Sequence, residues 1–364
     1  MLRHYQDAAE ARPDAFIRYE YTKLLDASRA AIAKYVHAPP STCVFVPNAT
    51  TGINIVLRNL VYAPGDVIVC FATIYGACEK TVEYIAETTP AESHKIEYRY
   101  PVSDEHLCSA FERAVTTIRA QGKTPRLAVF DTIVSLPGVR MPFERLTALC
   151  KRHRVLSCID GAHGVGHVPL DLAALDPDFF VSNCHKWLLV PRGCALFYVP
   201  ERNQHLMRST LPTSHGFAPW PKEGAQAINN PLPPSGKSDF VTNFEFVGTV
   251  DNSAYLCIPA AIEWRGRLSW QGRSGEEAVM AYTRYLSREV GRRVAGALGT
   301  EVMENAEATL GECNLSNVRL PLSYAEVARG DHGEAIKIAQ WIAKVFVEEY
   351  NTFMAIIFYD EAWW

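Results

Sequence analysis

The segment "VSNCHKWLLVPRG", residues 181–193, places a lysine just after the apolar run 178–182. The run is typical of a buried strand, so Lys186 would stand at the end of that strand with part of its hydration removed. A desolvated amine either finds an anionic partner or loses its proton, and a neutral lysine amine is a nucleophile that forms Schiff bases with carbonyl compounds. The alternative is a surface lysine whose aliphatic stem is covered while its ammonium stays in water.

An acidic residue ends the preceding apolar run. In "CIDGAHGVGH", residues 158–167, that residue is Asp160, and in a parallel sheet Asp160 and Lys186 would lie at the same rim. The pair fits the chemistry of pyridoxal phosphate (PLP), in which a carboxylate keeps the pyridine nitrogen protonated while the lysine holds the aldehyde and serves as base for the substrate α-proton. Taken alone, Asp160 could instead be the N-cap of a helix.

A phosphate group needs hydroxyls and backbone N–H donors at a helix N-terminus. The segment "FVPNATTGINIVL", residues 45–57, offers a strand, then polar and small residues, then an amphipathic helical pattern. The polar and small residues, which supply the candidate phosphate ligands there, are Asn48, Ala49, Thr50, Thr51 and Gly52. Ser182 and His185 flank the lysine and could reach the same phosphate. Helix capping without any ligand would use the same residues around position 50.

Two further side chains have types that suit such a cofactor. Tyr75, in "ATIYGACEK", follows the second strand, where it could stack on the pyridine ring or shuttle a proton, or be a half-buried core tyrosine. His163, three residues after Asp160, is placed to lie beside the cofactor's 3′-oxygen, although a structural histidine has the same pattern. Neither His163 with His167 nor the neighbouring Cys–His pair before Lys186 has the spacing of a closed zinc site, so no metal is predicted.

Seven short apolar, β-branched runs must position these residues. They cover 43–46, 66–72, 95–100, 126–130, 155–159, 178–182 and 194–199. Helical patterns fill several intervals, for example 50–60 and 142–153. Continuous apolar strands that alternate with helices predict an α/β fold with a mostly parallel sheet covered on both faces.

The character of the chain changes after the sheet region. Residues 217–238 are rich in proline and glycine and could form a lid or a plain surface loop. Longer helical patterns follow, with one strand-like run at 313–322. We therefore predict a large domain over residues 1–252 and a smaller α+β domain over 253–364.

Composition limits the class of protein. The 36 basic and 40 acidic residues give a net charge of −4 without a basic block, so nucleic acid is not expected as a partner. Ten scattered cysteines without a Cys-x-x-Cys pair indicate reduced, mostly buried thiols. There is no secretory signal pattern and no run of about 18 apolar residues, which predicts a soluble cytoplasmic protein that does not bind membranes.

Several motifs together resemble the class V aminotransferase superfamily of PLP enzymes. They are "NATTGIN", "TIYGAC", "DTIVSLPGVRMPFE", "DGAHGVGH", "SNCHKWL-x-x-PRGCA-x-FYV", "RNQHLMRSTLPTSHGF" and "NFEFVGTVDNS". Within that superfamily the chain resembles the fungal isopenicillin N epimerase-like branch, and most closely its ergothioneine-pathway hercynylcysteine sulfoxide lyases. The resemblance covers nearly the whole chain.

The resemblance implies a PLP-dependent transferase fold of type I with a seven-stranded sheet, and a homodimer with shared active sites. Lys186 would carry the Schiff base, Asp160 would pair with the pyridinium, and Tyr75 would stack on the ring and transfer protons. His163 would sit near the ring oxygen. The phosphate would be held by Ala49, Thr50, Ser182 and His185, and from the neighbouring subunit by Gly248 and Thr249.

The implied activity is that of a C–S lyase that cleaves an S-conjugated cysteine (sulfoxide) and releases pyruvate and ammonia. The alternatives are epimerisation or ring closure on the same cofactor, or a non-catalytic relative. Relatives begin earlier than Met1 with a stretch like Asn-His-Gly-Ser-Phe-Gly and continue past Trp364 into a segment whose arginine binds the substrate carboxylate. No arginine of this chain is therefore assigned to the carboxylate. The ergothioneine lyases carry glutamine at the position of His163, and pyrrolizidine-forming relatives carry histidine.

Overall fold

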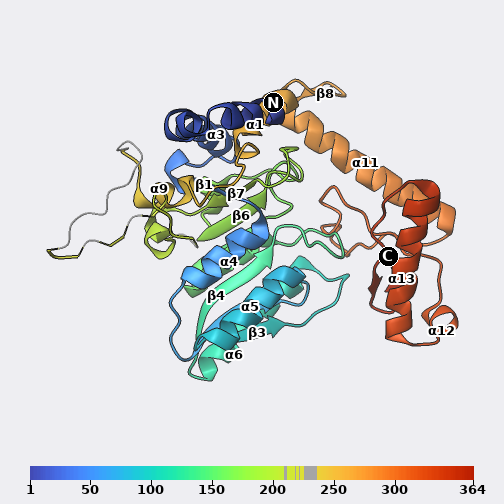
Figure 1. Ribbon diagram of the computed structural model, residues 1–364. Coiled ribbons are helices and arrows are strands. Elements are labelled where there is room, and N and C mark those ends of the chain that lie inside the picture. Colours follow the sequence, from blue (N-terminus) through green and yellow to red (C-terminus); the bar gives the residue numbers. More distant parts are fainter. Residues whose placement is uncertain (209–210, 218, 221, 225–235) are drawn as a thin grey trace.

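The computed structural model describes residues 1–208, 211–217, 219–220, 222–224 and 236–364. A twisted sheet with helices on both faces forms its main body, and the long helix α11 leads from it to a separate group of C-terminal elements (Figure 1). The proposed lid at 217–238 falls largely outside the described residues, which omit Pro221, Pro231, Pro233 and Pro234.

Seven strands form the central sheet in the order β1-β7-β6-β5-β4-β2-β3. The strands are β1 (Cys43–Val46), β2 (Asp66–Phe71), β3 (Glu92–Ile96), β4 (Thr124–Asp131), β5 (Leu156–Asp160), β6 (Phe179–Asn183) and β7 (Ala195–Tyr198). The pairs β2–β3, β2–β4, β4–β5 and β5–β6 are parallel, whereas β7 runs antiparallel to β1 and β6. The predicted mostly parallel sheet is therefore confirmed.

One strand lies earlier in the chain than its apolar run. The expected strand at 95–100 is β3, Glu92–Ile96, whose residues are mostly exposed. Because β3 is the edge strand and pairs only with β2, polar side chains are tolerated in it. Tyr98 and Tyr100, which made the apolar pattern, pack edge-on against each other beyond the end of the strand.

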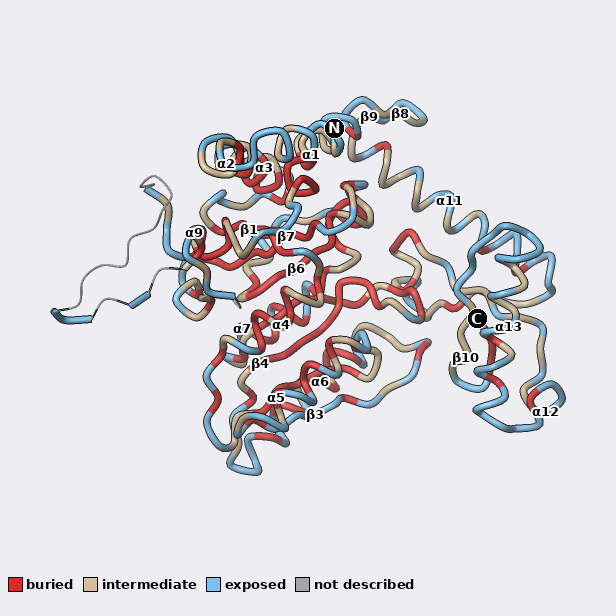
Figure 2. Tube along the Cα trace, in the orientation of Figure 1, coloured by how far each residue is buried: buried red, intermediate tan, exposed pale blue. Residues whose placement is uncertain are grey.

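Two apolar layers, one on each face of the sheet, hold the helices. One layer contains residues of α3 (Tyr21–Tyr35), α6 (Asp104–Ala120) and α7 (Phe143–His153). The other contains residues of α4 (Ala49–Asn59), α5 (Gly76–Thr88) and α9 (Asp239–Glu245). Successive strand residues alternate between the layers, which is why the strands other than the edge strand β3 are buried over most of their length (Figure 2).

Shorter elements complete the N-terminal part. They are α1 (Leu2–Ala11), α2 (Pro13–Ala15), η1 (Phe16–Glu20), η2 (Pro40–Thr42), α8 (Leu172–Leu175) and η3 (Glu201–Leu206). All ten cysteines are among the described residues, and each is buried and free of a disulfide. Within the described part of the chain, no helix is long and apolar enough to cross a bilayer.

The C-terminal part is mostly helical. It contains η4 (Tyr255–Cys257), α10 (Ile258–Gly266), β8 (Ser269–Trp270), β9 (Arg273–Ser274), α11 (Gly275–Leu298), α12 (Tyr324–Val327), α13 (His332–Tyr350), β10 (Phe358–Tyr359) and β11 (Ala362–Trp363). A small cluster around Trp363 and Ala335 forms its own apolar centre. The domain boundary near residue 253 stays a proposal, because Tyr255 and Ile258 pack into the core of the sheet.

The prediction of a strand at 313–322 was wrong. This segment contains one isolated bridge, between Val302 and Val318, and no strand. Its backbone groups bond to separate partners: the Arg319 N–H donates to the Glu301 carbonyl at 2.9 Å, and the Leu320 N–H to the Trp363 carbonyl at 2.8 Å. Since no single strand among the described residues runs alongside it, the strand-like pattern does not produce a ladder.

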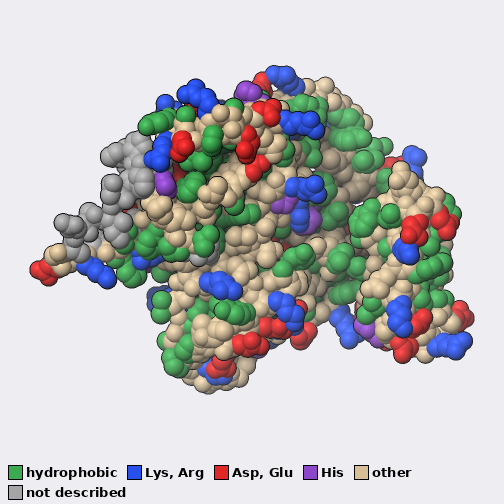
Figure 3. Space-filling view, in the orientation of Figure 1, with side chains coloured by type: hydrophobic (Ala, Val, Ile, Leu, Met, Phe, Trp, Pro, Cys, Tyr) green, Lys and Arg blue, Asp and Glu red, His purple; other side chains and the backbone are tan. Residues whose placement is uncertain are grey.

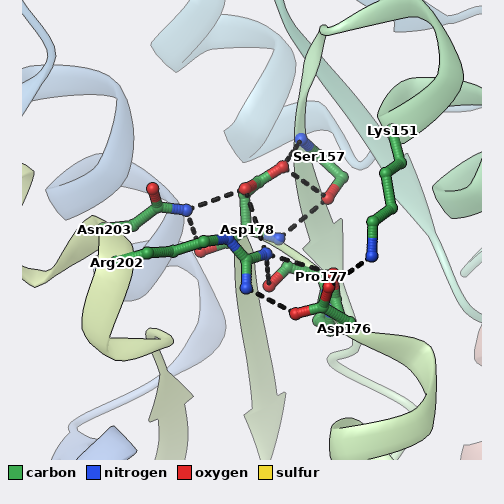
Figure 4. Close-up of polar contacts among 7 residues, drawn as sticks. All are labelled: Lys151, Ser157, Asp176, Pro177, Asp178, Arg202 and Asn203. Atoms are coloured by element: carbon green, nitrogen blue, oxygen red, sulfur yellow. Dashed lines mark hydrogen bonds and ion pairs between the residues drawn. The ribbon is translucent and has the colours of Figure 1, made fainter.

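A polar network fixes the starts of β5 and β6 (Figure 4). Asp178 accepts hydrogen bonds from the Ser157 N–H at 3.0 Å and from the Asn203 amide at 2.8 Å, and its own N–H donates to the Ser157 hydroxyl at 2.9 Å. Arg202 pairs with Asp178 and with Asp176. The network sets the pairing of the two strands at the rim opposite the residues predicted to carry chemistry.

Candidate active site

The carboxyl ends of the central strands bring the predicted catalytic residues to one rim. β5 ends at Asp160, and β6 ends at Asn183, three residues before Lys186. In the sheet register, Asp160 pairs with Val181 of β6 and with Asp131 of β4. The structure therefore places Asp160 and Lys186 together, as their positions after parallel strands predict.

Lys186 lies against a histidine. Its Nζ is 2.9 Å from Nε2 of His163, so the structure brings these two predicted residues into contact. Burial lowers the pKa of Lys186, while the charges of Asp160 and Asp131 act in the opposite direction. Burial, followed by the charge of Lys186, lowers the pKa of His163 to about 4. A neutral imidazole and an amine poised to lose its proton thus face each other.

Two buried carboxyl groups share the floor of the site. Burial, followed by the charge of Asp160, raises the pKa of Asp131 well above its usual range, and burial also raises that of Asp160. Asp160 accepts from the Ala162 N–H at 3.0 Å and from the Cys78 thiol at 3.2 Å, whereas no donor to the Asp131 side chain is found among the described residues. We therefore assign the charge to Asp160 and the proton to Asp131.

Sequence reasoning missed Asp131 and Cys78. Asp131 ends the apolar run "RLAVFD" just as Asp160 ends its own run, so the signal was present in the sequence. Cys78 lies in the first turn of α5 and could not be assigned without the fold, because its hydrogen bond to Asp160 spans 82 residues of chain.

Two of the predicted phosphate ligands, Ala49 and Thr50, lie in the first turn of α4. The side chain of Asn48 caps this helix by accepting from the Thr51 N–H at 2.8 Å, and the Ala49 N–H donates to the Asn183 side chain at 2.8 Å. Thr50 is half-buried in the first turn. The structure thus joins the start of α4 to the end of β6, and makes Asn183 a positioning residue that sequence reasoning missed.

Ser182 and His185 are held by the segments next to them. The Ser182 hydroxyl accepts from the Val165 N–H at 2.8 Å, which fixes the loop that carries His163. Nδ1 of His185 lies 2.8 Å from the Cys194 carbonyl and 3.2 Å from the Cys194 backbone nitrogen, so either tautomer finds a partner there and Nε2 is the outer nitrogen of the ring. A role for either residue in phosphate binding stays a prediction.

Tyr75, Gly248 and Thr249 are the remaining predicted residues. Tyr75 precedes the first residue of α5 and is 48% exposed, so its ring is free to cover a ligand. Thr249 lines a cavity of about 580 Å³ next to the N-terminal helices, and neither Lys186 nor Asp160 is among the lining residues of that cavity. Gly248 adopts a φ of +121°, which favours glycine. Among the described residues, no contact joins Gly248 or Thr249 to Lys186, so their predicted role at a partner's cofactor stays a prediction.

A buried arginine fixes the turn that contains Lys186. Arg265, on α10, donates to the Trp187 carbonyl at 2.6 Å and to the Gly166 carbonyl at 3.1 Å. Its Nε and Nη2 also bind Glu276 of α11 at 2.5 and 2.6 Å. Gly166 has a φ of +79°, and an added Cβ there would lie 2.6 Å from the Trp187 backbone, so the two turns can meet only at glycine.

These residues fit PLP by their chemistry. An amine with a lowered pKa suits the aldehyde, a buried carboxylate suits the pyridine nitrogen, and the start of α4 suits the phosphate. No cluster of three or more metal-ligating side chains occurs among the residues that the structure describes. On the face shown in Figure 3, acidic and basic side chains are interspersed.

The fold and site define a PLP enzyme of the α/β class. The chain belongs to the family described as "Aminotransferase class-V", which it matches over residues 4–231. Enzymes of this family carry PLP, which confirms the predicted cofactor, family and fold.

Comparison with curated proteins gives relatives over most of the chain. The L-cysteine desulfhydrase-like protein lolT1 of Epichloe uncinata is 39% identical, covering 98% of this chain and 82% of its own length. The related lolT2 of the same organism is 42% identical, over 89% of this chain and 71% of its own. Hercynylcysteine sulfoxide lyase of Schizosaccharomyces pombe is 27% identical, over 95% and 79%.

Solved structures share the fold. A complex of the cystine C–S lyase C-DES with its product cysteine persulfide has a TM-score of 0.71 at 21% identity, covering 94% of this chain and 81% of that chain. A C-DES mutant with glycine covalently linked to its PLP cofactor has a TM-score of 0.72 at 19% identity, over 98% and 84%. At these identities the likeness establishes the fold.

Proposed function

We propose that this protein is a PLP-dependent C–S lyase that cleaves the Cβ–S bond of a cysteine-derived amino acid. The observation that carries the proposal is the contact between Lys186 and His163 beside the charged carboxylate of Asp160. The names of its relatives support the reaction class, because they include desulfhydrase-like proteins and a sulfoxide lyase.

When bound, PLP would supply an aldehyde that reacts with amines and a ring that accepts electrons. Lys186 would hold the aldehyde and, once displaced by the substrate amine, take the α-proton on Nζ, for which its lowered pKa leaves a lone pair. Asp160 would face the pyridine nitrogen with its charge, which the Ala162 N–H and the Cys78 thiol stabilise. His163 would present its Nε2 side to the lysine and the cofactor oxygen.

The bond changes follow from these positions. The α-proton moves to Lys186, the sulfur leaves with the Cβ–S bonding pair, and addition of water converts the remaining three-carbon unit to pyruvate and ammonia. Tyr75, exposed at the start of α5, would stack on the ring and protonate the leaving sulfur. We further propose an S-conjugated cysteine sulfoxide, as in ergothioneine biosynthesis, as the substrate.

A second candidate keeps the cofactor and changes the outcome. Removal of the α-proton can be followed by its return, as in an epimerase, or by substitution and ring closure. Identity of 28% to the isopenicillin N epimerase of Amycolatopsis lactamdurans and a histidine at position 163 favour it. The substrate chemistry at Cα is the same in both candidates.

Product analysis tests the reaction. The purified protein would be supplied with PLP and either L-cysteine or an S-conjugated cysteine sulfoxide, and pyruvate and the sulfur product would be measured. We expect stoichiometric pyruvate from one of these substrates, and its loss in Lys186→Ala but not in the control Lys80→Ala, whose side chain is 75% exposed. Unchanged pyruvate release by Lys186→Ala would reject the assignment, and substrate consumption without pyruvate would favour the second candidate.

We also propose a cytoplasmic homodimer whose sites are shared. Thr249 is exposed and lines a cavity that Lys186 does not line, which suits a contribution to the partner's cofactor phosphate. Mixing Lys186→Ala with Thr249→Asp chains tests this proposal. Hybrid dimers would contain one site with both lesions and one with neither, so activity should reappear on mixing, whereas no recovery would contradict shared sites.

A further inference from the structure

Both ring nitrogens of His163 have a partner. Nε2 is 2.9 Å from Nζ of Lys186, and Nδ1 lies 3.0 Å from the indole nitrogen of Trp187. A flip of the ring would replace both nitrogens by carbons, so this orientation is the one that satisfies both contacts.

The hydrogen positions follow from the chemistry of the partners. An indole nitrogen can only donate, so Nδ1 of His163 must accept. A neutral imidazole carries one proton, and that proton must then lie on Nε2. The Nε2–H donates to Lys186, which can accept only as a neutral amine.

We propose that Trp187 is a positioning residue whose indole N–H fixes His163 as the Nε2–H tautomer, so that a hydrogen-bond donor faces Lys186 and the cofactor oxygen beside it. The proposal rests on the proposed function only in giving Lys186 a catalytic task. The tautomer itself is a property of the chain without cofactor.

Long-range contacts hold the indole in place. The ring of His167 packs on that of Trp187 with 4.2 Å between centroids, and Nε2 of His167 accepts from the Asn314 N–H at 2.6 Å. Arg265 binds the Trp187 carbonyl and ties it to Glu276. Trp187 is therefore fixed from both its side chain and its backbone.

The charged surroundings agree with this assignment. His163 faces Lys186 on one side and His167 on the other, and the pKa of both histidines is lowered, first by burial. Lys186 faces the protonated Asp131 and the charged Asp160, and although the charge of Asp160 favours the ammonium form, burial keeps the pKa of Lys186 lowered. A donor at Nε2 of His163 adds a further contact that only the neutral amine can use.

The test reads the tautomer directly. The full-length chain, freed of cofactor and labelled with 15N-histidine, would be studied by NMR at pH 8, with His163→Gln used to assign the signals. We expect His163 to show a protonated Nε2 and an unprotonated Nδ1. Trp187→Phe keeps an aromatic ring but removes the donor, so His163 should show the Nδ1–H tautomer. The control Trp264→Phe, which alters a half-exposed tryptophan, should leave the tautomer of His163 unchanged.

A second measurement follows the lysine. In Trp187→Phe, His163 can turn an acceptor toward Lys186, so the pKa of Lys186, measured from the pH dependence of its acylation rate, should rise by about one unit. In a His163→Ala background the same substitution should produce no rise. Either of two results would overturn the proposal: an Nδ1–H tautomer of His163 in the unaltered chain, or an unchanged tautomer in folded Trp187→Phe. If Trp187→Phe does not fold, the spectrum of the unaltered chain decides alone.

The two proposals fail separately. Pyruvate release that depends on Lys186, combined with an Nδ1–H tautomer, would reject the role of Trp187 and leave the lyase standing. An Nε2–H tautomer in a protein that releases no pyruvate from either substrate would reject the lyase and keep the role of Trp187.

Discussion

Replacement of Arg265 by leucine should destabilise the protein more than any single surface change. The guanidinium is 1% exposed and makes two hydrogen bonds to Glu276 and one to each of the Trp187 and Gly166 carbonyls. Leucine removes all four contacts, so the Trp187 and Gly166 carbonyls lose this donor, while Glu276 keeps the hydrogen bond from the Tyr35 hydroxyl at 2.7 Å. Breaking a buried ion pair by removing one partner costs about 3–5 kcal/mol.

The lower end of that range applies here. The Glu276 side chain is 31% exposed, so water can partly replace the lost guanidinium. We expect the free energy of unfolding to fall by about 3 kcal/mol. Urea titration of the cofactor-free chain, followed by tryptophan fluorescence and by circular dichroism, should show a lower midpoint with an unchanged slope.

The neighbouring arginine provides the matched control. Arg267 pairs with Glu263 at i, i+4 spacing on the exposed face of the same helix region, and the two side chains are 72% and 66% exposed. Arg267→Leu should cost no more than about 0.5 kcal/mol. Equal losses in Arg265→Leu and Arg267→Leu would refute the assignment of Arg265 as the residue that anchors the lysine-bearing turn.

Three further predictions concern charge, pH and the opposite rim. Asp160→Asn should lower turnover at least ~100-fold because the carboxylate that carries the charge is lost, whereas Asp131→Asn should change turnover little because asparagine resembles a protonated aspartate. Steady-state rates of the two variants test this, and equal losses would contradict the assignment of the charge. The pKa of His167 is lowered from 6.5 to about 3, so below pH 6.5 the unfolded chain binds more protons than the folded one, and stability decreases as the pH is lowered. Between pH 7 and pH 4 the unaltered protein should lose about 3 kcal/mol more of its free energy of unfolding than His167→Gln in urea titrations. Equal losses in the two proteins would count against a neutral buried histidine. Asp178→Ala should lower the free energy of unfolding by about 2–4 kcal/mol without changing PLP affinity, because it leaves buried donors at the opposite rim without an acceptor. The control Lys151→Ala, at a side chain 73% exposed, should cost under about 0.5 kcal/mol. A weakened affinity of Asp178→Ala for PLP would argue against a purely structural network.

The sequence was informative wherever a pattern was local. Apolar runs located the sheet strands, and a charged residue shortly after the end of such a run marked Asp160 and Lys186, because parallel strands end at one rim. Asp131 carried the same signal and was overlooked. The shift of β3 reflects its edge position, which burial patterns alone do not show.

Contacts between distant segments could not be foreseen. Arg265 reaches a carbonyl 78 residues away, and Asn314 reaches His167 across 147 residues. Both contacts depend on how α10 and the segment after α11 pack against the sheet rim. For the same reason the run at 313–322 looked like a strand, although its backbone partners come from several segments.

The identity of the cofactor-binding lysine is tested most directly by borohydride reduction of the PLP-loaded protein, followed by peptide mass mapping. We predict a yellow protein that loses its visible band on reduction, with the pyridoxyl adduct on the peptide that contains Lys186. An adduct on another lysine, or no band and no adduct when PLP is supplied, would contradict the active site described above.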